Sequence, residues 1–310
     1  MRVVHGFRGA PDEARGAALA IGNLDGVHRG HQALLAAAIE KGREIGAPAG
    51  ALVFEPHPRE FFHPEEPHFR ITSLAQKLGI FEQIGLDLAV VLDFDAELAG
   101  LAADDFVARV LVEGLGARHI VIGHDFFFGK NRGGTPDTMR AAADKHGFGV
   151  TIIAPVAEDG EVFSSSAIRL RLAQGDVKGA AHMLGRWWRA AGTVIGGAKR
   201  GVGLGFPTAN VPLARDTALG HGIYAVHAYQ GRERYDGAAY LGTRPTYDDG
   251  MPVLEVFLFD FDGDLYGRQM EIEFIDFIRA DRKFDTSEGL IVQMQADCAR
   301  AREILSAAKD

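Results

Sequence analysis

The chain has 310 residues, of which 47% are hydrophobic and 24% charged, and its formal net charge is −9. The length predicts two domains with sizeable cores, and the acidic balance argues against a protein that grips nucleic acid through a general basic field. A single cysteine, Cys298, forms no internal disulfide, which is typical of a reducing, cytoplasmic compartment. We find no signal peptide pattern and no apolar run of about 18 residues, so we expect no membrane association, and the oligomeric state stays open.

The first half alternates short apolar runs with helical periodicity. Five buried strands are predicted at Ala17–Ile21, Ala51–Phe54, Leu88–Leu92, His119–Ile122 and Val150–Ile153, and helices at His31–Ile45, Leu74–Ile84, Asp104–Gly114 and Pro136–His146. Strands that are apolar on both faces indicate an α/β domain with a parallel sheet covered on both sides. Such sheets bind ligands at the carboxyl ends of their strands. The turn after the first strand is therefore the first place to look for a site.

Two more helices follow, at Ser165–Gln174 and Asp176–Leu184, the second with Asp176 as its N-cap. The rhythm then changes to short strands rich in β-branched and aromatic residues, at Ala191–Ile195, Gly222–Tyr229, Tyr235–Leu241, Val253–Phe259 and Gln269–Phe277. This spacing predicts a small antiparallel β-barrel. A C-terminal helix with a capping box of Asp285 and Glu288 ends the chain. We place the domains at residues 1–185 and 186–310.

The segment GNLDGVHRGH, residues 22–31, lies where the first strand meets the first helix. Gly22, Gly26 and Gly30 let the backbone approach a ligand closely, and the N-terminal end of the helix favours anions. His28 and His31 stand three residues apart, so both could face one ligand. The arrangement suits a triphosphate and charge stabilisation at its α-phosphorus. A loop with two surface histidines and a zinc site are the alternatives.

A second glycine-rich segment, GGAKRGVGLGFPTANV, spans residues 196–211. Val202 and Gly203 stand where a Walker motif requires Lys and Ser or Thr, so this is not a P-loop. The hydroxyl of Thr208 and the amide of Asn210 are hard oxygen donors suited to Mg²⁺ that shares phosphate oxygens. A simple turn near Pro207 is the alternative.

The first half resembles the HxGH nucleotidyltransferases, and among them the adenylyltransferase domain of prokaryotic bifunctional riboflavin kinase/FAD synthetases. Further matching segments are VFEPHPREFF at 53–62, GHDFFFGKNRGG at 123–134 and SSSAIR at 164–169. The resemblance implies a Rossmann-like fold and ATP contacts from Gly22, Asn23, Asp25, His28, His31, Gly123, Asp125, Ser164, Ser166 and Arg169. Aromatic faces and prolines suit a flat flavin ring, with core packing as the alternative, at Phe54, Pro56, Pro58, Phe62 and Phe128.

The second half resembles riboflavin kinases in its strings GFPTAN, GIYAV at 222–226, GTRPTY at 242–247, LEVFLFDFDGDLYG at 254–267 and IRADRKF at 278–284. That family has a six-stranded barrel with a terminal helix. The resemblance implies a Mg-ATP site formed by Gly196, Lys199, Arg200, Gly201, Thr208 and Asn210. It also makes Glu255 the base that takes the proton from the ribityl hydroxyl, and puts Arg279 near the flavin or phosphate. An outward-facing strand glutamate is the alternative for Glu255.

Both resemblances together predict an enzyme that phosphorylates riboflavin to FMN with Mg-ATP in the second domain and adenylylates FMN to FAD in the first. Four positions depart from the family: Leu24 replaces Phe, Phe127 replaces a frequent Arg, Val202 replaces Arg or Lys, and Phe257 replaces a frequent His. The last two leave open an enzyme in which only the adenylyltransferase is active. A flavin- or nucleotide-binding regulator without turnover is the third hypothesis, although a binding protein has no need of a base at position 255.

Overall fold

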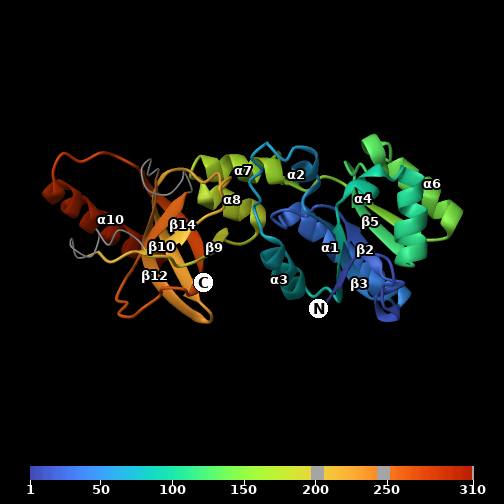
Figure 1. The fold of residues 1–310 in the computed structure, drawn as a ribbon, viewed down its shortest axis with the longest axis horizontal. Helices are drawn as coiled ribbons and strands as arrows, with labels where there is room; N and C mark the ends of the chain where they lie inside the picture. Colours follow the sequence, from blue (N-terminus) through green and yellow to red (C-terminus); the bar gives the residue numbers. More distant parts are fainter. Residues whose placement is uncertain (197–205, 243–251, 309–310) are drawn as a thin grey trace. The chain divides into compact units, whose positions relative to one another are not determined.

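The computed structural model describes residues 1–196, 206–242 and 252–308. It divides into two compact units, Met1–Ser165 and Ser166–Asp310 (Figure 1). Each unit is described by itself below. No helix among the described residues has both the length and the apolar character needed to cross a membrane.

The first unit contains a six-stranded parallel sheet with the order β1-β4-β3-β2-β5-β6. Its strands are β1 (Arg2–His5), β2 (Ala18–Ile21), β3 (Ala49–Glu55), β4 (Leu88–Asp93), β5 (His119–Gly123) and β6 (Gly149–Ile153). The five predicted strands are confirmed. The prediction missed β1, because this edge strand is short, begins and ends in polar residues and is mostly exposed.

Two apolar cores cover the two faces of this sheet. Alternate residues of β2 show the division, since Leu19 and Ile21 belong to one core and Ala20 belongs to the other. The core around Ala20 includes residues of α1 (Arg29–Ile45) and α3 (Leu74–Ile84). The opposite core includes η2 (Phe106–Gly114) and α6 (Pro136–His146). The predicted doubly covered parallel sheet is therefore confirmed (Figure 1).

Short elements complete the first unit. They are η1 (Asp12–Ala14), α2 (Pro58–Phe62), α4 (Ala96–Gly100), α5 (Ala103–Asp105), η3 (Lys130–Arg132) and the hairpin of β7 (Ala157–Glu158) with β8 (Glu161–Val162). The helix predicted from Asp104 is divided between α5 and η2. In η2 the turns are wider than in an α-helix, as the bond from the Leu115 N–H to the Val110 carbonyl at 3.0 Å shows.

The second unit forms a near-closed antiparallel barrel with the order β10-β13-β12-β11-β14-β9. The strands are β9 (Arg189–Thr193), β10 (Ala209–Pro212), β11 (Gly222–Gln230), β12 (Glu233–Gly242), β13 (Val253–Leu258) and β14 (Gln269–Ala280). A bridge between Ile195 and Asn210 joins the two edges. The predicted barrel is confirmed, and only β10 was missed, because its four residues follow a segment rich in Gly and Pro.

The described residues of this half of the chain include the helices α7 (Ser165–Ala173), α8 (Val177–Leu184) and α10 (Ser287–Ala307). Asp176 caps α8 as predicted, because its carboxylate accepts from the Gly179 N–H at 2.8 Å. The capping box predicted for the last helix is wrong. Thr286 is the N-cap and accepts from the Gly289 N–H at 3.1 Å, so a glycine stands where the box requires Glu or Gln.

Candidate active sites

The loop between β2 and α1 lies at the topological switch point of the sheet. Strands β3 and β4 extend the sheet to one side of β2, whereas β5 and β6 lie on the other side. The loop itself is strained. Leu24 and Val27 are buried at 1% and 0% exposure and have φ values of 48° and 43°, which side chains with a Cβ rarely adopt. Strain of this kind persists only where the surroundings hold the backbone in place.

Those surroundings are a set of hydrogen bonds to the loop. The Asp25 carboxylate, 3% exposed, accepts from the Ile71 and Thr72 backbone N–H groups at 3.1 Å each and from the Thr72 hydroxyl at 3.3 Å. The Gly26 N–H donates to the Thr72 hydroxyl at 3.0 Å, and the Ser165 hydroxyl donates to the Asp25 carbonyl at 2.9 Å. The described contacts of Asp25 therefore shape the loop, and its predicted role as an ATP contact stays a prediction.

The two histidines of the loop form one pair. His28 is the N-cap of α1, and its Nδ1 accepts from the His31 N–H at 3.3 Å. The two imidazoles stack with centroids 3.6 Å apart. Gly30 makes room for this arrangement, because a Cβ at that position would come within 3.0 Å of the His28 ring. A neutral His28 imidazole then carries its proton on Nε2.

Burial distinguishes this pair from surface histidines. His28 is 6% exposed, and the Nδ1 of His31 is buried without a hydrogen-bond partner in the described part of the chain. Burial, with smaller effects from His28 and Lys77, lowers the pKa of His31 well below its usual value. The described residues contain no group of three side chains that could hold a zinc ion. The arrangement suits imidazole donors that face an anion at a helix N-terminus.

The remaining residues predicted for the nucleotide lie on three segments. Gly123 ends β5, and the exposed Asp125 follows it, with its carboxylate folded back over the glycine. Ser164 precedes α7, whereas Ser166 and Arg169 lie in the first two turns of that helix and belong to the second unit. Their roles at the nucleotide stay predictions.

An aromatic cluster lies beyond the end of β3. Phe62 is 57% exposed and meets Phe61 and Phe94 edge-on, with centroids 5.2 and 5.7 Å away. Phe54 contacts the same Phe94 at 5.8 Å. Phe128, in contrast, is 6% exposed and belongs to the core. Among the predicted flavin contacts of this cluster, Phe62 is the one with a largely exposed ring. Phe61 and Phe94 pack against that ring, and the sequence analysis did not predict them.

The two predicted prolines flank a group of charges that sequence reasoning missed. Pro56 is exposed and Pro58 begins α2. Arg70 donates to the Glu55 carboxylate at 2.6 Å and also to the Glu60 carboxylate. Burial raises the pKa of Glu60, but the hydrogen bond from Arg70 and the charges of Arg70, His68 and His57 together lower it. No periodic signal connects these three residues in the sequence.

Lys77 is a further residue that sequence reasoning missed. It is 5% exposed, and its Nζ donates to the Asn23 carbonyl at 2.6 Å. A signal for it existed, because Lys77 stands on the apolar stripe of α3, three residues after Leu74 and four before Phe81. A lysine on the buried face of a helix indicates a particular partner.

The candidate kinase site lies on the outer face of the barrel. Glu255 stands directly opposite Asn210 across the β10–β13 pair and opposite Tyr240 across the β12–β13 pair, so these three side chains share one face. The neighbours Leu254 and Val256 point into the barrel and are fully buried. Glu255 therefore faces outward, and the same face carries the Asn210 amide, two residues after Thr208. Its predicted role as the base stays a prediction.

Asn210 is 6% exposed, and its Nδ2 lies 3.5 Å from the Thr208 carbonyl. Its Oδ1 accepts no hydrogen bond from the described residues, which leaves a hard oxygen donor beside Glu255. Phe257, a departure from the family, packs against Phe206 with centroids 5.2 Å apart. Gly196 is exposed, whereas Lys199, Arg200, Gly201 and Val202 lie outside the described residues.

Arg279, predicted near the flavin, has its guanidinium engaged within the unit. It forms a two-pronged pair with Asp297 of α10, whose carboxylate oxygens lie 2.9 and 2.7 Å from Nε and Nη2. Asp297 is 5% exposed. The pair ties β14 to α10, and the predicted ligand contact of Arg279 stays a prediction.

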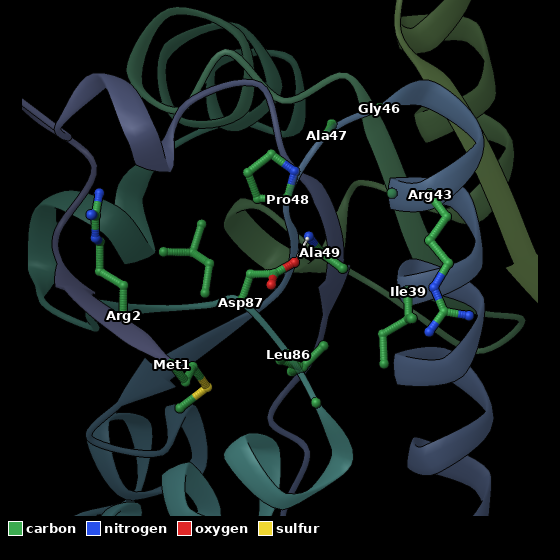
Figure 2. Close-up of a pocket in the computed structure, with 13 residues that line it drawn as sticks. Met1, Arg2, Ile39, Arg43, Gly46, Ala47, Pro48, Ala49, Leu86 and Asp87 are labelled. Carbon is green, nitrogen blue, oxygen red and sulfur yellow. Dashed lines mark hydrogen bonds between the residues drawn. The ribbon is translucent and has the colours of Figure 1, made fainter.

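A cavity of about 830 Å³ opens at the amino ends of β3 and β4, away from the loop after β2 (Figure 2). Arg2 and Arg43 lie on opposite sides of it, and the Asp87 carboxylate accepts from the Ala49 N–H at 2.9 Å. None of the predicted site residues lines this cavity.

Comparison with known proteins gives matches in both halves. A family model for FAD synthetase matches residues 10–167, and one for riboflavin kinase matches residues 184–305. A bifunctional riboflavin kinase/FMN adenylyltransferase of Pseudomonas fluorescens is 41% identical over 98% of both chains. Its counterpart from Escherichia coli K12 is 37% identical over 100% of this chain and 98% of its own. A crystal structure described as a macrolide-efflux protein from Streptococcus pneumoniae is 30% identical, with a TM-score of 0.85 over 96% of this chain and 97% of its own.

Proposed function

The chain belongs to the family of bifunctional riboflavin kinase/FMN adenylyltransferases, and we propose that it makes FMN from riboflavin and FAD from FMN, with ATP as co-substrate in both steps. The segment matched by the FAD synthetase model carries the adenylyl transfer, and the segment matched by the riboflavin kinase model carries the phosphorylation. The observation that carries the proposal is the buried His28–His31 pair at the N-terminus of α1, beside a strained loop at the switch point of the sheet.

In the adenylyl transfer, a phosphate oxygen of FMN attacks the α-phosphorus of ATP and pyrophosphate leaves. No covalent intermediate with the protein is needed, because positioning and charge stabilisation supply most of the rate. The His28 imidazole and the N-terminal N–H groups of α1 donate to phosphate oxygens as charge moves onto them. The lowered pKa of His31 keeps its imidazole neutral, so it acts as a hydrogen-bond donor and not as a cation.

The flavin end of the substrate is assigned to the aromatic cluster. The exposed face of Phe62 offers a stacking surface for the isoalloxazine ring, held by Phe61 and Phe94 beneath it. Pro56 and Pro58 border the same segment. This assignment leaves Phe128 with its role in the core.

In the kinase step, the Glu255 carboxylate accepts the proton of the ribityl 5′-hydroxyl while that oxygen attacks the γ-phosphorus of ATP and ADP leaves. The residues present fit a magnesium ion, since Thr208 and the Oδ1 of Asn210 are hard oxygen donors on the face of Glu255. A bound Mg²⁺ would neutralise phosphate charge there. General-base assistance of this kind is worth about 10²- to 10⁴-fold in rate.

Two further points belong to the proposal. The boundary between the two activities at residues 185 and 186 is supported by the riboflavin kinase model, which begins at residue 184. The single buried cysteine, Cys298, supports a reducing, cytoplasmic setting.

The test is an assay of the purified full chain with riboflavin and Mg-ATP, in which the flavins are separated by chromatography. FMN should appear first and FAD after it, and chelation of the metal by EDTA should stop FMN formation. FAD from added FMN without any FMN from riboflavin would leave only the adenylyltransferase active. Neither product from a folded preparation would refute the proposal.

A further inference from the structure

The ammonium group of Lys77 is buried with few partners. The residue is 5% exposed, and its one hydrogen bond in the described structure runs from Nζ to the Asn23 carbonyl at 2.6 Å. No carboxylate oxygen of the described residues lies within ion-pair distance of it. An ammonium has three N–H donors, so two of them have no partner within the chain as described. Because a buried charge without partners is costly, such a group indicates a ligand.

The carboxylates whose charges act on Lys77 are engaged elsewhere. Asp25 accepts the three hydrogen bonds from Ile71 and Thr72. Glu55 and Glu60 both accept from Arg70. These carboxylates support the charge of Lys77 from a distance, but burial still lowers its pKa. The described residues therefore leave part of the hydrogen-bonding capacity of Lys77 unused.

The position of Lys77 identifies the anion. Its bond to Asn23 places Nζ under the loop that precedes α1, and its charge acts on His31 at the start of that helix. The orphan Nδ1 of His31 belongs to the same region. The unused N–H groups of the ammonium and the unpartnered imidazole nitrogen of His31 fit a group with several oxygens. Resting on the function proposed above, we propose that Lys77 binds a phosphate oxygen of the substrates of adenylyl transfer.

Two sources supply such an oxygen: the triphosphate of ATP and the phosphate of FMN. Both groups present anionic phosphate oxygens, so the proposed contact is to phosphate in either case. Steady-state kinetics distinguish ATP from FMN as the source of that phosphate. A raised KM for ATP in a Lys77 variant assigns the nucleotide. A raised KM for FMN assigns the flavin phosphate.

The test compares Lys77→Gln and Lys77→Met with the wild type and with Lys145→Gln, a control at an exposed lysine of α6. Glutamine keeps a donor for the Asn23 carbonyl but removes the charge. Because a hydrogen bond to a charged group contributes strongly, kcat/KM for FAD formation should fall roughly ten- to hundredfold in both Lys77 variants. FMN formation from riboflavin, which belongs to the other unit, should stay at the wild-type rate.

A structural role makes a different prediction. Lys77→Gln keeps a donor for the Asn23 carbonyl, so removal of the buried charge in this variant should leave the Tm of the ligand-free protein within about 2 °C of wild type or raise it. If Lys77 is instead needed for the fold, the Tm of this variant falls. The inference is overturned if Lys77→Gln keeps kcat/KM within threefold of wild type, or if it loses activity together with the ligand-free Tm. Wild-type protein that makes no FAD would instead refute the proposed function itself.

Discussion

Replacement of Asp25 by alanine tests how the nucleotide loop is held. The substitution leaves the backbone N–H groups of Ile71 and Thr72 without their acceptor at 3.1 Å. A buried donor without a partner costs about 1–3 kcal/mol, so the two together cost about 2–6 kcal/mol. The loop also loses the contacts that hold Leu24 and Val27 at positive φ. We therefore expect a lower free energy of unfolding and a large loss of FAD formation.

The free energy is measured by urea unfolding followed by far-ultraviolet circular dichroism, and the loop is followed by hydrogen exchange. Peptides that contain the loop and the start of α3 should exchange faster in the variant. Asp144→Ala, an exposed aspartate of α6, is the control and should change stability by less than about 0.5 kcal/mol. Wild-type stability and unchanged exchange in Asp25→Ala would refute the reasoning.

Two further predictions concern a histidine and an aromatic residue of the segment that follows β3. Burial, followed by the charge of His68, lowers the pKa of His57 to about 4. The unfolded chain takes up this proton near pH 6.5 while the folded chain does not, so the free energy of unfolding should fall as the pH falls from about 6.5 to 4. His57→Gln should flatten that slope, and an unaltered pH profile in the variant contradicts the prediction. Phe62→Ala should raise the KM for FMN in FAD formation severalfold and lower stability by only about 1 kcal/mol, because the ring is 57% exposed; an unchanged KM rules out the stacking role.

Much of the fold was predictable because its elements are locally consistent. The bounds predicted for α3 and α6 agree with the structure at both ends, since Ser73 and Thr135 are N-caps, and Gly85 and Gly147 are C-caps with positive φ. The elements that were missed depend on distant partners. Strand β10 exists through its pairing with β13, and Thr286 became the cap of α10 where local sequence favoured Asp285.

The candidate sites also contain residues that local sequence predicts and residues whose contacts depend on distant parts of the chain. The motifs at His28, His31 and Glu255 could be found because they are local strings, and the register that sets Asn210 opposite Glu255 follows from strand pairing. The contact of Lys77 with the loop joins residues that are 54 positions apart. Nothing in the periodicity of α3 says which loop its buried lysine meets, so this part required the structure.

The most direct measurement of the central claim is a pair of single variants assayed for both reactions in the same preparations. His28→Asn keeps a side chain that caps α1, and Glu255→Gln keeps the shape of the residue. We predict that His28→Asn loses FAD formation from FMN and keeps FMN formation from riboflavin, and that Glu255→Gln does the reverse. Loss of both reactions in either variant, or of neither, would contradict two separate sites with separate chemistry.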